Sequence, residues 1–182
     1  MAIRNHPQRA VSEQNGLGKV HEHIGEYGGD SARIAIAGHS AGGYLVGLLA
    51  LDGRDLGKHG LDPASHIRAA APISGFFHID RVAPARPKTV WGEDPSAWPD
   101  DSPSKYVSAQ APPMLCLFAD GDVEARRDES RDLVAELEST GNAHASHLEI
   151  ANRNHGSIAR LLNEDGDATS AAIVEFFKKH LR

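Results

Sequence analysis

A serine between glycines, in the stretch Gly38-His39-Ser40-Ala41-Gly42-Gly43, has the spacing of a nucleophile held in a sharp turn. In a G-x-S-x-G turn a strand reverses directly into a helix, so the flanking positions leave little room for side chains and the hydroxyl lies exposed above the sheet. Apolar, strand-like residues 33–37 precede the turn, and the apolar, helix-compatible residues 44–51 follow it. This setting favours a nucleophilic Ser40 over a packing turn of small residues.

A serine hydroxyl is a weak nucleophile at neutral pH, so it needs a histidine to take its proton and an acid to orient that imidazole. Asp122 and His155 each lie in a loop just after an apolar, strand-like stretch. Because sites in open parallel sheets form beyond the carboxyl ends of the strands, we expect both side chains on the same edge as Ser40. The sequence therefore predicts Ser40 as nucleophile, Asp122 as acid and His155 as general base.

Both partners of Ser40 have alternatives. Asp120-Gly121-Asp122 is also a sequence that favours a turn for purely structural reasons. If Asp122 is not the acid, Asp120 is the nearest substitute. His155 is one of 11 histidines, but it is followed by a Gly-Ser helix start, whereas His144 and His147 flank or enter a strand. Its position is therefore the reason for choosing His155.

Other chemistries have weaker support. The chain has no H-E-x-x-H, no cysteine pair and no phosphate-binding glycine pattern, so we expect neither a metal nor a cofactor. Cys116 lies in an apolar run and is predicted to be a buried core thiol. A formal charge of −6 without a Lys/Arg cluster argues against nucleic acid or an anionic membrane as partner, and a small-molecule substrate is expected instead.

The elements that must position these groups alternate along the chain. A helix is predicted where Leu17, Val20, Ile24 and Tyr27 recur at helical spacing before Gly28-Gly29. Further strands are predicted over residues 67–73, 114–119 and 147–150, with a charged helix up to Gly141 and a last helix over 173–181. The alternation predicts an α/β fold: a three-layer, mostly parallel sheet with helices on both faces.

Residues 74–113 break this pattern, since they carry seven prolines together with several aromatic residues. Long irregular segments of compact domains tend to be lids or binding loops, so we predict a lid-like segment here. Phe76, Phe77 and Trp91 are candidate substrate-binding residues. Aromatic side chains line concave sites, but they also cover sheets, and both interpretations stay open.

Length and composition fit a single domain over residues 1–182. The chain is 40% hydrophobic and 24% charged, and no apolar run approaches the length of a membrane span. The first nine residues lack the apolar region of a signal peptide, which favours a cytoplasmic location by default.

Taken together, these residues resemble the carboxylesterase and feruloyl-esterase-like branch of the α/β-hydrolase superfamily, whose relatives include arylformamidases. In those hydrolases, too, serine, acid and histidine follow one another in the chain. The resemblance implies that Ser40, Asp122 and His155 cleave a carboxylic ester through an acyl-enzyme. It runs through most of the chain and rests on residues 27–30, 33–43, 102–103, 111–113, 120–122 and 154–158.

The sequence departs from that family ahead of Ser40, where only 39 residues stand. Family members carry several strands and a His-Gly-Gly loop there, and the chain contains no His-Gly-Gly. We therefore expect an amino-terminally truncated hydrolase in which the backbone N–H of Ala41 supplies one oxyanion donor and the donors of that loop are missing. The strand over residues 33–37 is expected to be an apolar sheet edge that invites self-association.

Three functions follow from this reading. The first is hydrolysis of small carboxylic esters, with activity impaired by the incomplete oxyanion site. The second is hydrolysis of an N-formyl aryl amide by the same three residues. The third is a non-catalytic remnant or interaction domain that keeps the sheet but lacks a complete site.

Overall fold

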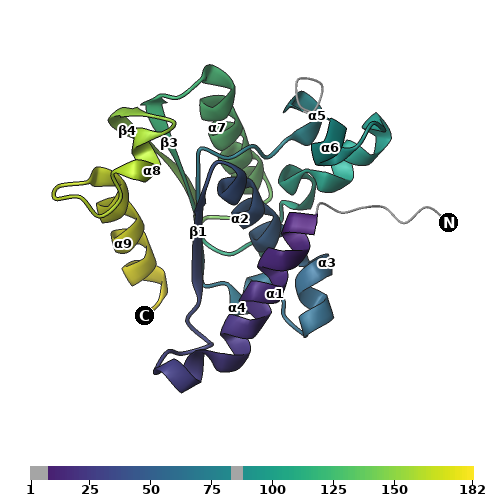
Figure 1. Ribbon diagram of the computed structural model, residues 1–182, viewed down its shortest axis with the longest axis vertical. Coiled ribbons are helices and arrows are strands. Elements are labelled where there is room, and N and C mark those ends of the chain that lie inside the picture. The colour runs from purple at the N-terminus through teal and green to yellow at the C-terminus, as the bar shows by residue number, and fades with distance from the viewer. Residues whose placement is uncertain (1–7, 83–87) are drawn as a thin grey trace.

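A computed structural model of the chain describes residues 8–82 and 88–182. Its centre is a sheet of four strands, all parallel and in the order β1-β2-β3-β4 (Figure 1). Their bounds are β1 Ala35–His39, β2 Ala69–Ile73, β3 Met114–Gly121 and β4 Ala145–Asn154. The parallel sheet expected from the alternating pattern is confirmed.

Helices and short helical turns connect these strands. The longer helices are α1 (Gln8–His23), α2 (Ala41–Leu51), α7 (Glu124–Ser139) and α9 (Ala168–His180). The short ones are η1 (Ile24–Tyr27), α3 (Gly53–Leu56), η2 (Gly57–His59), α4 (Pro63–His66), α5 (Ile79–Val82), α6 (Lys88–Trp91), η4 (Pro95–Asp101), η5 (Pro103–Tyr106) and α8 (Ser157–Arg160). Among the described residues, no helix is both long enough and apolar enough to cross a membrane.

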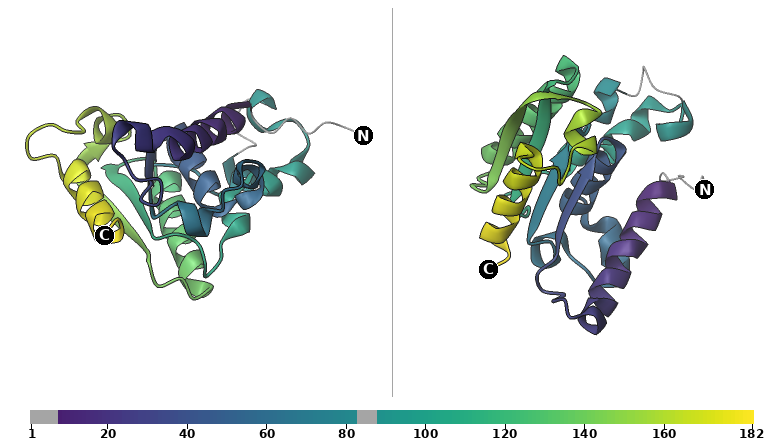
Figure 2. Two further views of the ribbon diagram at one scale, coloured as in Figure 1. Left: turned by 90° about the horizontal axis from the view of Figure 1, so that it is seen from below. Right: turned by 60° about the vertical axis from the view of Figure 1, so that its left-hand side comes forward.

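Side chains of β3 alternate between the two faces of the sheet and build a core on each. On one face Met114 and Cys116 pack with residues of α2 and α7, such as Leu49 and Leu133. On the other face Leu115, Leu117 and Ala119 pack with Ile158 and, beyond it, with partly buried residues of α9. Figure 2 shows α1 and α9 on opposite sides of the sheet, which gives the three layers predicted for the fold.

Cys116 is completely buried and forms no disulfide, as the sequence predicted. Burial raises the pKa of its thiol to about 12, so the thiolate is not populated at neutral pH.

The strand before the nucleophile turn lies at the edge of the sheet. Among the described strands β1 pairs only with β2, and its other side faces a groove of about 430 Å³. The groove is mainly apolar, and Leu17, Val20, Ile36, Leu45 and Leu49 line it from α1, β1 and α2. The edge position of this strand agrees with the sequence; the self-association inferred from it stays a prediction.

The segment over residues 74–113 is less irregular than its prolines suggested. The described part folds into α5, α6, η4 and η5, whereas residues 83–87 lie outside the described part. Pro95 and Pro103 open η4 and η5, because the fixed φ of proline suits the first helical position. The prolines therefore begin short helices here, and the lid-like role of the segment stays a prediction.

Candidate active site

Ser40 occupies the sharp turn between β1 and α2, with φ of 57° and ψ of −112°. A side chain other than glycine rarely adopts positive φ, so the surrounding structure must hold this backbone in place. The N–H of Ser40 donates to the carbonyl of Ile73 at the end of β2, at 2.8 Å, and its carbonyl accepts the N–H of Tyr44 at 3.0 Å. These bonds fix the turn to the neighbouring strand and to the first turn of α2.

Two glycines of the turn leave no room for a side chain. A Cβ on Gly38 would lie 2.6 Å from the carbonyl oxygen of Gly42, and one on Gly43 would lie 2.8 Å from that of Ile73. A Cβ on Gly42 would meet nothing within 4 Å in the described part of the chain, because Gly42 lies on the groove beside β1. The crowding expected on both sides of the serine therefore holds at Gly38 and not at Gly42.

The three residues chosen from the sequence as nucleophile, base and acid lie in contact. The Ser40 hydroxyl is 3.0 Å from Nε2 of His155, and Nδ1 of His155 is 2.9 Å from Oδ1 of Asp122. With the proton on Nδ1, the imidazole donates a hydrogen bond to the carboxylate of Asp122, and its Nε2 accepts a hydrogen bond from the Ser40 hydroxyl. Loops after β1, β3 and β4 supply these side chains at one end of the sheet, the upper end in Figure 1.

Asp120, the alternative acid, has a different set of partners. Its carboxylate accepts the backbone N–H groups of Asn152 at 2.8 Å and Arg153 at 3.0 Å, and these bonds lower its pKa. Asp120 therefore ties the end of β3 to the end of β4, just before His155. Asp122 is the aspartate of this turn that contacts the imidazole.

The carboxylate of Asp122 is fully enclosed, with no exposed side-chain surface. Besides the bond to His155, its Oδ2 accepts the N–H of Ala119 at 3.0 Å and the hydroxyl of Ser74 at 2.5 Å. A buried carboxylate is tolerated when donors of this kind satisfy its oxygens. The side chain of His155 is 38% exposed, so the imidazole reaches solvent while the acid behind it does not.

A second histidine lies beside the imidazole of His155. The ring of His39 is 4.6 Å from that of His155, centroid to centroid. Burial lowers the pKa of His39, and the charge that His155 can carry lowers it further, so His39 is neutral at neutral pH.

The three aromatic residues proposed to bind substrate lie in different surroundings. Phe77 has no exposed surface and packs in the core close to Gly47 and Gly75, so the prediction that it contacts substrate is wrong for the described structure. Phe76 is half-buried, with the guanidinium of Arg126 4.0 Å from its ring centre. The indole of Trp91 packs edge-on against Tyr44, and for Phe76 and Trp91 substrate binding stays a prediction.

Ala41 is the first residue of α2 and is exposed. The first N–H groups of a helix have no acceptor within the helix, and the helix dipole favours negative charge near them. The position of Ala41 directly after Ser40 is thus compatible with the predicted oxyanion contact. Within residues 8–82 and 88–182, no group of three His, Cys, Asp or Glu side chains is arranged to hold a metal ion.

Sequence reasoning missed Ser74 and His39. Ser74 directly follows β2, so the rule that selected residues after strand ends would have found it as well. His39 lies inside the serine motif itself, but nothing in the sequence indicates that its ring packs against a histidine 116 positions later.

The profile of the prolyl oligopeptidase family matches residues 19–182. Curated relatives from Mycobacterium tuberculosis (strain ATCC 25618 / H37Rv) include Esterase LipQ, 29% identical over 82% of this chain and 38% of its own length. Probable carboxylic ester hydrolase LipM is also 29% identical, over 94% of this chain and 42% of its own length. The chain thus spans about two fifths of the length of these relatives.

Solved structures show the same fold at low sequence identity. A truncated form of a carbohydrate esterase from gut microbiota has a TM-score of 0.78 and 18% identity, and the match covers 97% of this chain and 69% of that one. A propionate-bound thermophilic esterase from Thermogutta terrifontis has a TM-score of 0.71 and 21% identity, over 93% of this chain and 64% of that one. The resemblance to α/β-hydrolases is confirmed: the chain belongs to the prolyl oligopeptidase family and has the α/β-hydrolase fold.

Proposed function

We propose that this chain carries the catalytic residues of an ester hydrolase in which Ser40, His155 and Asp122 act as nucleophile, general base and acid. The observation that carries the proposal is the continuous contact from the Ser40 hydroxyl through both nitrogens of His155 to the enclosed carboxylate of Asp122. The names of LipQ and LipM, which describe ester hydrolysis, favour an ester as the substrate class.

In the proposed reaction, Oγ of Ser40 attacks the carbonyl carbon of the ester while its proton moves to Nε2 of His155. The negative charge that develops on the carbonyl oxygen faces the N–H of Ala41, and Asp122 stabilises the imidazolium. The tetrahedral species then collapses: the bond to the alkoxy oxygen breaks and His155 returns the proton to the departing alcohol. Water, activated by the same imidazole, releases the acid from the acyl-enzyme.

The absence of a His-Gly-Gly sequence bears on the rate of this reaction. Loss of one oxyanion donor typically lowers kcat by about 10² to 10³. We therefore infer impaired turnover with small carboxylic esters when the N–H of Ala41 is the main donor, because formation and hydrolysis of the acyl-enzyme both pass through an oxyanion.

The decisive experiment compares the purified chain with Ser40→Ala and with Ser130→Ala. Ser130 is a buried serine of α7 whose hydroxyl donates to the carbonyl of Arg126 in its own helix, so it is a matched control. With p-nitrophenyl acetate and butyrate, we expect hydrolysis by the wild type and Ser130→Ala and none above background by Ser40→Ala. Equal rates in all three would exclude the serine mechanism.

A fluorophosphonate probe separates slow catalysis from no catalysis, because it reacts with an activated serine without turnover. We expect labelling of the wild type and none of Ser40→Ala. A folded wild type that neither labels nor hydrolyses esters would support the non-catalytic interaction domain instead. Including an N-formyl aryl amide in the substrate panel tests the amide alternative.

A further inference from the structure

We propose that Ser74 is a positioning residue of this site, whose hydroxyl holds the carboxylate of Asp122 in the orientation that serves His155. The proposal rests on the proposed function, in which Asp122 orients and stabilises the imidazole. Ser74 itself has no exposed surface, so it acts through Asp122 and does not touch substrate.

The two oxygens of Asp122 have separate tasks. Oδ1 accepts the imidazole N–H, whereas Oδ2 accepts the Ser74 hydroxyl at 2.5 Å and the N–H of Ala119 at 3.0 Å. The backbone N–H belongs to the same turn as the carboxylate, so it can follow Asp122 when that turn moves. Ser74 comes from the neighbouring strand connection, and its hydroxyl therefore fixes the carboxylate to a second element of the sheet.

Ser74 reaches the carboxylate through an unusual backbone conformation. It directly follows β2, its N–H donates to the carbonyl of Leu117 at 2.8 Å, and its φ is 49°. Serine at positive φ is strained, and glycine would adopt the same conformation at lower cost. Glycine at this position would relieve the strain, but it would lack the hydroxyl that contacts Asp122.

Helix α7 holds this turn on both sides. Arg126 donates from Nη1 to the carbonyl of Ser74, and Glu129 accepts the N–H groups of Phe77 at 2.7 Å and His78 at 2.8 Å. The same helix begins two residues after Asp122. Ser74 and Asp122 are thus both attached to α7, which holds the Ser74 hydroxyl and the Asp122 carboxylate at hydrogen-bond distance.

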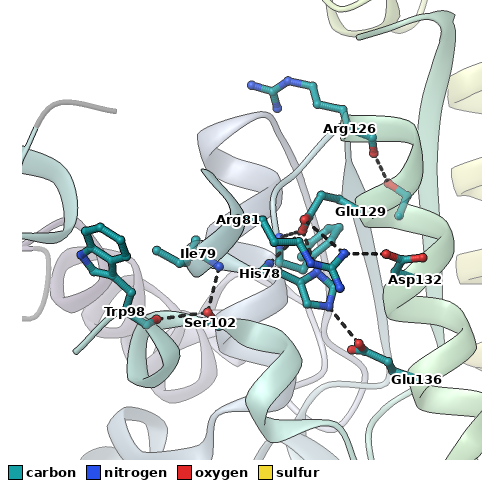
Figure 3. Close-up of polar contacts among 11 residues, drawn as sticks. His78, Ile79, Arg81, Trp98, Ser102, Arg126, Glu129, Asp132 and Glu136 are labelled. Carbon is teal, nitrogen blue, oxygen red and sulfur yellow. Dashed lines mark hydrogen bonds and ion pairs between the residues drawn. The ribbon is translucent and has the colours of Figure 1, made fainter. Parts of the chain in front are cut away.

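An ion network strengthens the attachment, as Figure 3 shows. His78 lies between two carboxylates of α7, with Nδ1 2.8 Å from Glu129 and Nε2 3.0 Å from Glu136. Arg81 reaches Asp132 at 2.5 Å on the same helix face. The residues after Ser74 are therefore bound along about two turns of α7, from Glu129 to Glu136, which opposes relaxation of the left-handed turn.

Two variants separate the hydroxyl from the backbone. Ser74→Ala removes the hydroxyl and keeps the strained φ, whereas Ser74→Gly removes the hydroxyl and relieves the strain. A merely conformational role predicts that Ser74→Gly behaves as the wild type. The positioning role predicts that both variants lose kcat to a similar extent, with Ser130→Ala as the buried serine control.

Steady-state kinetics on p-nitrophenyl acetate, corrected for the fraction of protein that a fluorophosphonate titrates, gives the first readout. Hydrogen bonds to charged groups are worth enough to lower kcat by about 10- to 10²-fold when one is lost. We expect that loss in both Ser74 variants, with KM within about twofold of the wild type, because Ser74 does not touch substrate. Wild-type kcat in Ser74→Gly would overturn the proposal.

The second readout does not need turnover. The proton between Nδ1 of His155 and Asp122 gives a downfield NMR resonance, which can be assigned by its loss in His155→Gln. We expect this resonance to move upfield in Ser74→Ala and Ser74→Gly and to stay in place in Ser130→Ala. If the wild type hydrolyses no ester, the proposed function fails, and the resonance alone decides on Ser74: an unshifted signal overturns the positioning role.

Discussion

The imidazole rings of His39 and His155 lie against each other, with 4.6 Å between their centroids and 40° between their planes. His39 is the last residue of β1 and His155 follows β4, so the contact joins the strand before Ser40 to the proposed base. Burial and the neighbouring His155 both lower the pKa of His39, so the ring that packs against the proposed base is neutral at neutral pH.

His39→Ala should lower kcat for p-nitrophenyl acetate more than His39→Phe does. The phenyl ring keeps the packing surface against His155, whereas alanine removes it. Aromatic contacts are worth about 0.5–1.5 kcal/mol, so we expect up to about a tenfold loss in the alanine variant. Equal kcat values for the two variants would show that the ring contact does not support the base.

The free energy of unfolding should decrease as pH rises through a window set by the pKa of His78. Burial alone lowers the pKa of this imidazole, but hydrogen bonds and charges from Glu129 and Glu136 outweigh it and raise the pKa overall. A raised pKa means that the stabilisation is fully present below the pKa of the unfolded chain, about 6.5, and is lost as pH rises through the higher folded value. Arg81 and Asp132 are further charged side chains of this network.

Urea unfolding of the wild type and His78→Phe between pH 5.5 and 9 measures this window. We expect the difference in the free energy of unfolding between the wild type and His78→Phe to be largest at pH 5.5 and to shrink as pH rises. A difference that is constant over the whole range would contradict a protonated His78 in the folded state.

Glu129→Ala should destabilise the fold strongly. This carboxylate is 2% exposed and accepts two backbone N–H groups as well as the imidazole of His78. Removing one partner of a buried charged pair typically costs about 3–5 kcal/mol. Glu138→Ala, on the exposed side of the same helix, is the control and should change the free energy of unfolding by less than about 0.5 kcal/mol.

Two alanine substitutions in the serine turn should have opposite effects on stability. Gly38→Ala places a Cβ 2.6 Å from a backbone oxygen and should cost at least about 1–3 kcal/mol. Gly42→Ala adds a methyl group where the described chain has space and improves helix propensity by roughly 0.5–1 kcal/mol. Thermal unfolding of both variants checks the prediction, and a destabilised Gly42→Ala would mean that the groove beside β1 is occupied in solution.

Self-association through that groove can be tested with two valines. Val20 is 43% exposed and lines the groove, whereas Val174 is 47% exposed on α9 at the opposite side of the sheet. We expect concentration-dependent association in sedimentation experiments, weakened by Val20→Lys and retained in Val174→Lys, since a charge protects an apolar edge. A monomer at all concentrations would exclude association through the edge.

The sequence was sufficient to predict the parallel sheet and the residues that follow the carboxyl ends of its strands. Both depend on local periodicity and on the order of elements along the chain. The strand before Ser40, for example, was placed within two residues of β1. It was insufficient where tertiary packing decides. Phe77 resembles an aromatic of a binding wall, yet it fills the space over Gly47 in the core. The prolines of residues 74–113 resembled loop formers, yet two of them, Pro95 and Pro103, begin helical turns.

The positive φ of Ser74 is a feature that the sequence could not predict. Nothing local requires positive φ in a serine that follows an apolar strand. The conformation depends on Arg126 and Glu129, which lie more than 50 positions later and approach only when α7 packs against the sheet. The place of Ser74 after a strand end was therefore predictable, whereas the positive φ from which its hydroxyl reaches Asp122 was not.

Ser40, Ser74, Asp122 and His155 follow β1, β2, β3 and β4 in turn, so all four strands deliver one residue to the same end of the sheet. The opposite end carries none of them, and its turn between α7 and β4 contains the exposed Gly141 at φ of 91°. Exposed turns of this kind tolerate inserted sequence. Gly141 is therefore a place to insert a ligand-binding domain, about four helical turns along α7 from Arg126, which holds the Ser74 turn.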